Sequence, residues 1–111
     1  MHLVTAIVKP FKLEDVRQAL DAHNVRGLTV TEVRGFGASP DPERLSVDDG
    51  FVVDFPTRFR IELVVNDDTL DSVMETISTS ARTGNQDTRI YATQLEQVVR
   101  IRTGETGPEA V

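Results

Sequence analysis

The chain has 111 residues, of which 39 % are hydrophobic and 27 % are charged, as is usual for a single globular domain. It contains no cysteine and two histidines, which excludes disulfide bonds, a thiol nucleophile and a metal site rich in cysteine or histidine. Eighteen acidic and twelve basic residues give a net charge of −6, which argues against nonspecific binding to nucleic acids or membrane surfaces. No apolar run approaches the ~20 residues of a membrane span and no signal-peptide pattern opens the chain, so we expect a cytoplasmic protein.

The first third of the chain predicts a strand, a helix and a second strand. Residues 2–8 are rich in β-branched side chains and alternate in polarity, which is typical of a strand. Pro10 ends this strand, and apolar residues at helical spacing then predict a helix over about 13–23. Residues 28–34 alternate with period two and predict the second strand. A polar, proline-containing stretch follows that is longer than most loops inside a compact domain.

The rest of the chain predicts a similar set of elements. Residues 58–65 read as a strand, and residues 70–81 as an amphipathic helix. Residues 89–92 and 95–102 read as one or two closing strands, and 106–111 as a loose tail. The order βαββαβ predicts a ferredoxin-like α+β sandwich, in which both helices cover one face of an antiparallel sheet. We expect another subunit to cover the remaining face.

Three stretches together resemble the PII signal-transduction family: AIVKPFKLEDVR at 6–17, GLTVTEVRGFG at 27–37 and VRIRTGE at 99–105. The resemblance extends over residues 1–105. It implies a regulatory homotrimer, not an enzyme, that binds an adenine nucleotide (ADP, AMP or ATP) in clefts between neighbouring subunits. It also implies a T-loop, here about residues 38–55, that contacts a membrane transporter or a metabolic enzyme of nitrogen or related nutrient metabolism.

The same resemblance implies which residues bind the nucleotide. The wall around the adenine would consist of Gly27, Leu28, Thr29, Glu62 and Val64. The remaining nucleotide-binding residues would be Gly35, Phe36, Gly37, Ala38, Arg58, Arg89, Arg100 and Arg102. If Arg100 and Arg102 alternate along a strand, their guanidinium groups share a face and suit phosphate oxygens. Taken alone, such a pair also fits a solvated strand face, and a Gly-x-Gly pattern also fits a simple turn.

The long loop departs from the family pattern at several positions. Ala38 and Ser39 stand where the family has an arginine and a magnesium-ligating glutamine. Phe51 stands at the position of the modifiable tyrosine, and because it has no hydroxyl we expect no uridylylation there. Ser46 could accept a phosphate, although an exposed loop serine usually has no such role.

The second phosphate loop also differs, because residues 83–89 lack the later glycines of the family and with them backbone donors. Arg89 keeps a positive charge there, and Arg58 replaces a lysine. We therefore expect ADP or AMP to bind not much more weakly than ATP, with little enhancement by 2-oxoglutarate. The magnesium dependence stays open.

Other functions remain open from the residues alone. The chain also fits a structural or interaction trimer whose pocket has lost its ligand. A small phosphate-handling enzyme is a weaker alternative, because no side chain has the surroundings of an activated nucleophile. We expect no metal site formed by the side chains. We also expect no nucleic-acid partner, because the charge is acidic and no basic strand with interleaved aromatic residues is present.

Overall fold

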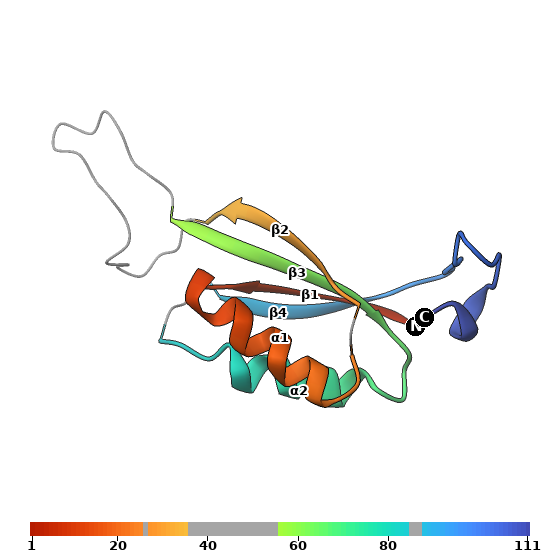
Figure 1. The fold of residues 1–111 in the computed structure, drawn as a ribbon, viewed down its shortest axis with the longest axis horizontal. Helices are drawn as coiled ribbons and strands as arrows, with labels where there is room; N and C mark the ends of the chain where they lie inside the picture. Colours follow the sequence, from red (N-terminus) through yellow and green to blue (C-terminus); the bar gives the residue numbers. More distant parts are fainter. Residues whose placement is uncertain (26, 36–55, 85–87) are drawn as a thin grey trace, which may run out of the picture.

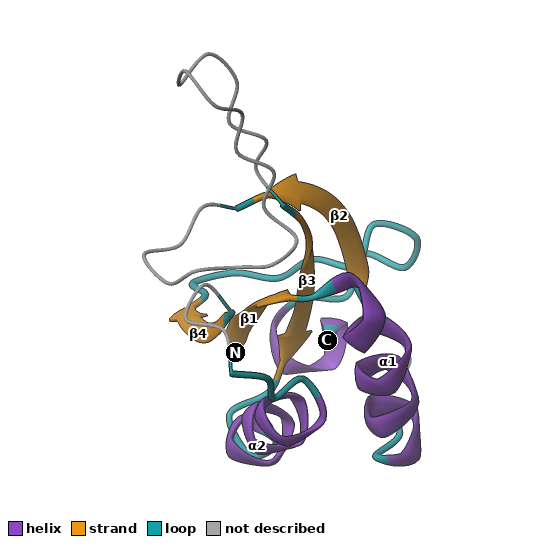
Figure 2. Cartoon of the chain, turned by 90° about the vertical axis from the view of Figure 1, so that its left-hand side faces the viewer, coloured by secondary structure: helices purple, strands orange, loops and turns teal. Residues whose placement is uncertain are grey.

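The computed structural model describes residues 1–25, 27–35, 56–84 and 88–111. Within these ranges the regular elements are β1 (His2–Val8), η1 (Pro10–Lys12), α1 (Leu13–Ala22), β2 (Thr29–Arg34), β3 (Thr57–Val65), α2 (Leu70–Ser80), β4 (Arg89–Gln94) and η3 (Gly107–Ala110). The strands form an antiparallel sheet in the order β2-β3-β1-β4 (Figure 1). Both helices lie on the same side of this sheet (Figure 2). The predicted ferredoxin-like α+β fold is therefore confirmed.

The register of the sheet determines which side chains share its open face. Glu62 on β3 stands opposite Thr5 on β1 and opposite Thr29 on β2. Thr5 in turn stands opposite Tyr91 on β4. Directly opposite residues of neighbouring strands point to the same side of a sheet. These four residues therefore form one row across the face that the helices leave uncovered.

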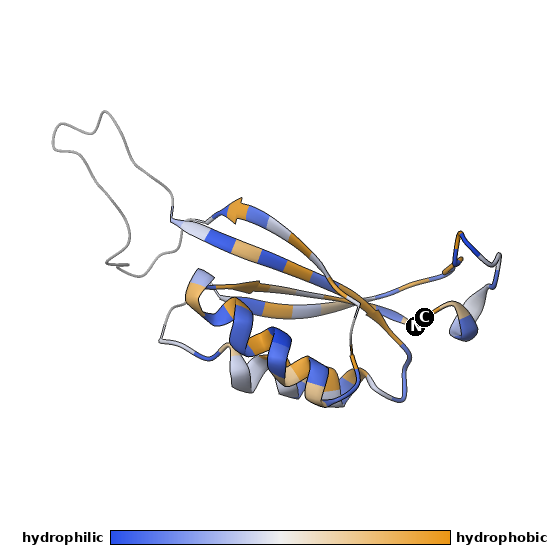
Figure 3. Ribbon diagram, viewed as in Figure 1, coloured by the Kyte–Doolittle hydropathy of each residue, from blue (hydrophilic) through white to orange (hydrophobic). Residues whose placement is uncertain are grey.

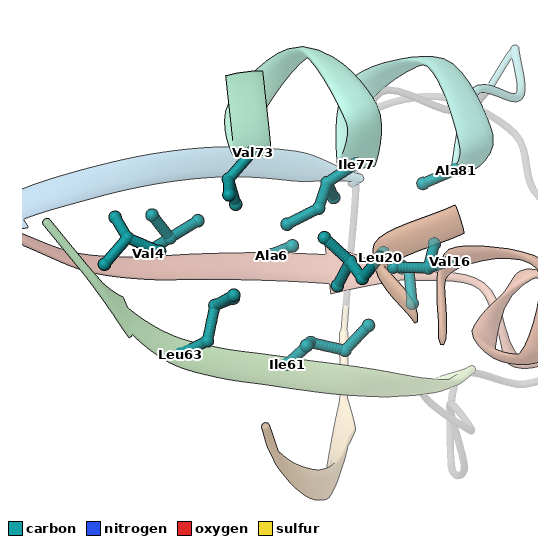
Figure 4. Close-up of a cluster of buried hydrophobic side chains, with 11 residues drawn as sticks. Val4, Ala6, Val16, Leu20, Ile61, Leu63, Val73, Ile77 and Ala81 are labelled. Carbon is teal, nitrogen blue, oxygen red and sulfur yellow. The ribbon is translucent and has the colours of Figure 1, made fainter. Parts of the chain in front are cut away.

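Alternate residues of β1 and β3 point the other way, into a core against the two helices (Figure 4). The fully buried Val16 and Leu20 lie four residues apart on α1, which places them on one side of the helix. Hydrophilic and hydrophobic residues recur in turn along α1, as expected of an amphipathic helix (Figure 3). The buried residues of the core are Val4, Ala6, Val8, Val16, Leu20, Ile61, Leu63, Val65, Val73, Ile77 and Ala81.

The prediction of a closing strand over residues 95–102 is wrong. β4 ends at Gln94, and further along Val99 forms an isolated antiparallel bridge with Thr106. Between these two residues the chain turns back on itself, with the Gly104 nitrogen donating to the Arg100 oxygen at 2.7 Å. Gly104 has φ +75°, a conformation that glycine adopts without the cost of a Cβ. The apolar residues at 98–101 thus lie in, or directly before, a tight turn.

The segment 106–111, predicted as a loose tail, contains η3 and contacts the loop before α2. Asn66 Nδ2 donates a hydrogen bond to the Pro108 oxygen at 3.2 Å. Ala110 is buried. The N-terminus contacts the same loop, because the Met1 amine lies 2.6 Å from Asp67 Oδ1. The connection between β3 and α2 therefore holds both the first residue and the C-terminal segment.

Replacement of Leu20 by alanine tests the core. We expect Leu20→Ala to lower the free energy of unfolding by about 2–5 kcal/mol, because it removes buried apolar contacts and leaves a cavity. Gln18→Ala, on the exposed side of the same helix, should change it by less than about 0.5 kcal/mol. Urea denaturation followed by circular dichroism measures both. Equal midpoints for the two variants would contradict the described core.

The contact between Met1 and Asp67 predicts a pH dependence of stability. The hydrogen bond from the Met1 amine holds the pKa of the Asp67 carboxyl below its ordinary 3.8, and the charges of the amine and of nearby His2 act in the same direction. Because the folded pKa is the lower one, the contact stabilises the fold above pH 3.8 and loses this effect as the pH falls through the folded value.

We therefore expect Asp67→Asn to lower the denaturation midpoint at neutral pH, and the difference from the unmodified chain to vanish in strong acid. Denaturation of both proteins over a series of pH values measures this difference. A difference that stays constant down to the lowest pH would show that the carboxylate charge contributes nothing.

Candidate functional site

The five residues expected around an adenine lie together in the structure. Gly27 and Leu28 lead into β2, Thr29 begins that strand, and Glu62 and Val64 lie on β3. They line one shallow, open depression, to which Leu3 and Leu63 also contribute. The pairing of Thr29 with Glu62 explains the arrangement, because it brings the start of β2 to the second half of β3. The depression thus combines apolar walls with one hydroxyl and one carboxylate group.

The carboxylate of Glu62 has a cationic neighbour that the sequence reasoning missed. Arg60 Nε lies 3.2 Å from Glu62 Oε1, and both side chains are partly buried. The two residues are two positions apart on β3 and therefore face the same side of the sheet. The spacing of two positions on a strand was the sequence signal that could have identified Arg60 as a neighbour of Glu62. The ion pair holds the Glu62 side chain along the strand, at the edge of the depression.

Arg58 lies on the same side of β3, two positions before Arg60, and is fully buried. Its Nη1 donates a hydrogen bond to the Thr57 carbonyl oxygen at 2.8 Å. A buried guanidinium needs several such partners, because the loss of hydration is costly. Nearby, Gly35 N donates to the Pro56 oxygen at 3.0 Å, which continues the β2–β3 pairing. Arg58 therefore lies at the end of the sheet from which the long loop departs.

Arg89 belongs to a second depression, of about 200 Å³, between the end of α2 and the start of β4. Arg82, Thr83 and Thr88 also line it. This hollow lies on the helix side of the sheet, since Ile77 and Ala81 of the core also line it. Arg89 stands opposite Ile7 in the sheet, so its side chain belongs to the open face.

Arg100 and Arg102 are placed differently from the expectation. They lie in the turn between Val99 and Thr106, so the prediction of a paired position on one strand is wrong. Arg100 Nη1 lies 3.7 Å from Glu105 Oε1, and its Nη2 donates to the Val111 oxygen at 3.2 Å. Arg102 is exposed. Neither lines the two depressions of its own chain.

The remaining expected positions fall outside the described residues: Phe36, Gly37, Ala38, Ser46 and Phe51. Across the described ranges, no three side chains of His, Cys, Asp or Glu lie close enough together to hold a metal ion by themselves. The same ranges contain no helix with the length and apolar character needed to cross a membrane.

The antiparallel sheet with both helices on one face defines a small α+β protein of the ferredoxin-like class. A family model described as "Nitrogen regulatory protein P-II" matches residues 1–105. The chain is 45 % identical to a nitrogen regulatory protein P-II of Cereibacter sphaeroides and 45 % identical to the nitrogen regulatory protein GlnK of Escherichia coli strain K12. It is 44 % identical to a P-II protein of Mesorhizobium japonicum, and each alignment covers both chains in full.

The chain belongs to the P-II family of nitrogen regulatory proteins. The resemblance stated from the three sequence stretches is thereby confirmed. The relatives are regulatory signalling proteins and not enzymes, which agrees with the expected class of function.

Proposed function

We propose that the chain forms a homotrimer that binds adenine nucleotides in clefts between its subunits. It then regulates a transporter or a metabolic enzyme through the T-loop, about residues 38–55. The observation that carries the nucleotide site is the depression at the start of β2. The five residues expected to contact the adenine line it together, although Thr29 and Glu62 are 33 positions apart in the sequence.

The chemistry of the depression supports a purine as the ligand. The side chains of Leu3, Leu28 and Val64 provide apolar surface for a flat ring. The Glu62 carboxylate is an acceptor for an exocyclic amine, and the Thr29 hydroxyl both donates and accepts. The space beside Gly27 is open, since a Cβ there would meet nothing within 4 Å of its own chain.

The cationic groups that would hold phosphates come from two copies of the chain. Arg89 lies on the open face of one subunit, and the fully buried Arg58 belongs to the same side of the sheet. The turn that carries Arg102 extends from the far end of the sheet (Figure 1), and its Ile101 is 96 % exposed. When a neighbouring subunit covers Ile101 of this chain, Arg102 of this chain lies at the nucleotide site of that neighbour. The site is therefore complete only in the oligomer.

We expect Arg102→Ala to weaken ADP binding about tenfold or more, because each charge-assisted hydrogen bond contributes roughly 1.5–3 kcal/mol. Arg17→Ala is the matched control, since Arg17 lies on the outer side of α1 and pairs with Glu14. Its affinity should equal that of the unmodified chain. Isothermal titration calorimetry measures the affinities, and sedimentation shows whether three chains associate.

A monomer in solution, or an Arg102→Ala variant with unchanged affinity, would refute the shared site. An intact trimer that shows no thermal shift with any adenine nucleotide would instead favour an interaction trimer that has lost its ligand.

The replaced loop residues lead to a second expectation for the nucleotide site. Ala38 and Ser39 lack the guanidinium and amide groups that the family uses for phosphate and magnesium. We expect AMP, ADP and ATP to differ in affinity by no more than about tenfold, and 2-oxoglutarate to add little to ATP binding. Calorimetry with and without Mg²⁺ tests this. Tight Mg²⁺-ATP binding that 2-oxoglutarate strengthens would contradict it.

A further inference from the structure

Three potential metal-binding groups converge where β1 begins. The Met1 amine lies 2.6 Å from Asp67 Oδ1, and His2 Nδ1 lies 2.9 Å from the same oxygen. The sheet produces this arrangement, because His2 pairs with Val65 and Asp67 follows two positions later. The site lies at the end of the sheet opposite the long β2–β3 connection (Figure 1).

One of these groups lacks a satisfactory partner. His2 Nδ1 is inaccessible to solvent, and despite its proximity to Asp67 it makes no hydrogen bond of acceptable geometry. The contact with Asp67 is an ion pair only when the imidazole is protonated, so in the neutral imidazole a lone pair on Nδ1 would face a carboxylate without a donor between them. A metal ion that accepts this lone pair removes the repulsion between the two groups.

The spacing of the donors agrees with metal coordination. Bonds of about 2.0–2.1 Å from one ion to two ligands at a right angle place those ligands roughly 2.9 Å apart. The two separations at Asp67 Oδ1, 2.6 and 2.9 Å, lie close to this value. The Asp67 side chain is 70 % exposed, which leaves room for water to complete the coordination.

We propose that the Met1 amine, His2 Nδ1 and the Asp67 carboxylate bind one divalent late first-row transition-metal ion. Cu²⁺ is preferred to Zn²⁺, because sites of nitrogen and oxygen donors follow that order of affinity. Binding releases the proton of the amine and any proton on the imidazole nitrogen, while the carboxylate is already ionised. Affinity therefore falls as the pH is lowered.

The sequence did not predict this site, because one donor is a backbone amine and not a side chain. The rest of the chain offers few other donors for a transition-metal ion, since it has no cysteine and a single other histidine, His23. The amine and Asp67 lie 66 positions apart and meet only in the folded chain. The ion should therefore bind the folded state selectively and raise its melting temperature.

The test uses nucleotide-free protein that begins at Met1 without a tag. Cu²⁺, Zn²⁺ and Mg²⁺ are titrated separately by calorimetry and thermal melting in a buffer that does not coordinate metals. We expect one Cu²⁺ per chain with an increase in melting temperature, weaker Zn²⁺ binding, and no binding of Mg²⁺ at this site. Electron paramagnetic resonance of the Cu²⁺ form should show coupling to two nitrogen nuclei.

Binding measurements on variants identify which groups coordinate the metal ion. We expect His2→Gln and Asp67→Asn each to weaken Cu²⁺ binding about tenfold or more, as loss of a ligand or of its support does in known sites. A Gly-Ser extension before Met1 keeps every side chain but displaces the amine, and should weaken binding similarly. His23→Gln is the matched control and should bind as the unmodified chain does.

Unchanged Cu²⁺ affinity in His2→Gln or in the extended chain would overturn the proposal, as would loss of binding in His23→Gln. Nucleotide binding does not enter these measurements, so their outcome is independent of the function proposed above.

Discussion

The alternation of β3 is the constraint on which the rest of the structure depends. Ile61 and Leu63 point into the core, while Arg60, Glu62 and Val64 point to the open face. Because β3 pairs with both β1 and β2, this single strand places core residues and candidate ligand-binding residues at once. A slip of one position would exchange the two faces and bury the ionic side chains against the helices.

Charge is distributed unevenly over the sheet. The chain is acidic overall, yet Arg58, Arg60 and Arg89 gather on one side of the sheet. Glu62 is the acidic residue among them on β3, and its pairing with Arg60 keeps that carboxylate in place. The local charge of this face therefore differs in sign from the net charge of the chain, and local charges act most strongly at short range.

Most of the fold could be predicted from the residues because each element has a clear period. β1 matches the expected 2–8, and the apolar spacing of Val16 and Leu20 indicates both α1 and its buried side. The prediction of a closing strand was wrong because the local pattern at 98–101 does not show that the chain reverses at Gly104. Pattern alone cannot distinguish a short turn with apolar residues from a strand.

Of the candidate site, too, one part could be predicted from the sequence and another part could not. The residues expected around an adenine were named from the family resemblance, and the register of β2 and β3 brings them together. Arg60 and the Met1 amine could not be found by matching side-chain patterns. Their importance arises from contacts that exist only after β1, β2 and β3 have assembled, at Glu62 and at Asp67 respectively.

The pairing of β1 has a consequence for synthesis on the ribosome. β1 leaves the exit tunnel well before both of its partners, β3 and β4. Until residue 65 has emerged, the apolar side of β1, with Val4, Ala6 and Val8, has no strand beside it and must wait next to the locally formed α1. Between the emergence of β1 and that of β3, this apolar side depends on α1 alone for cover.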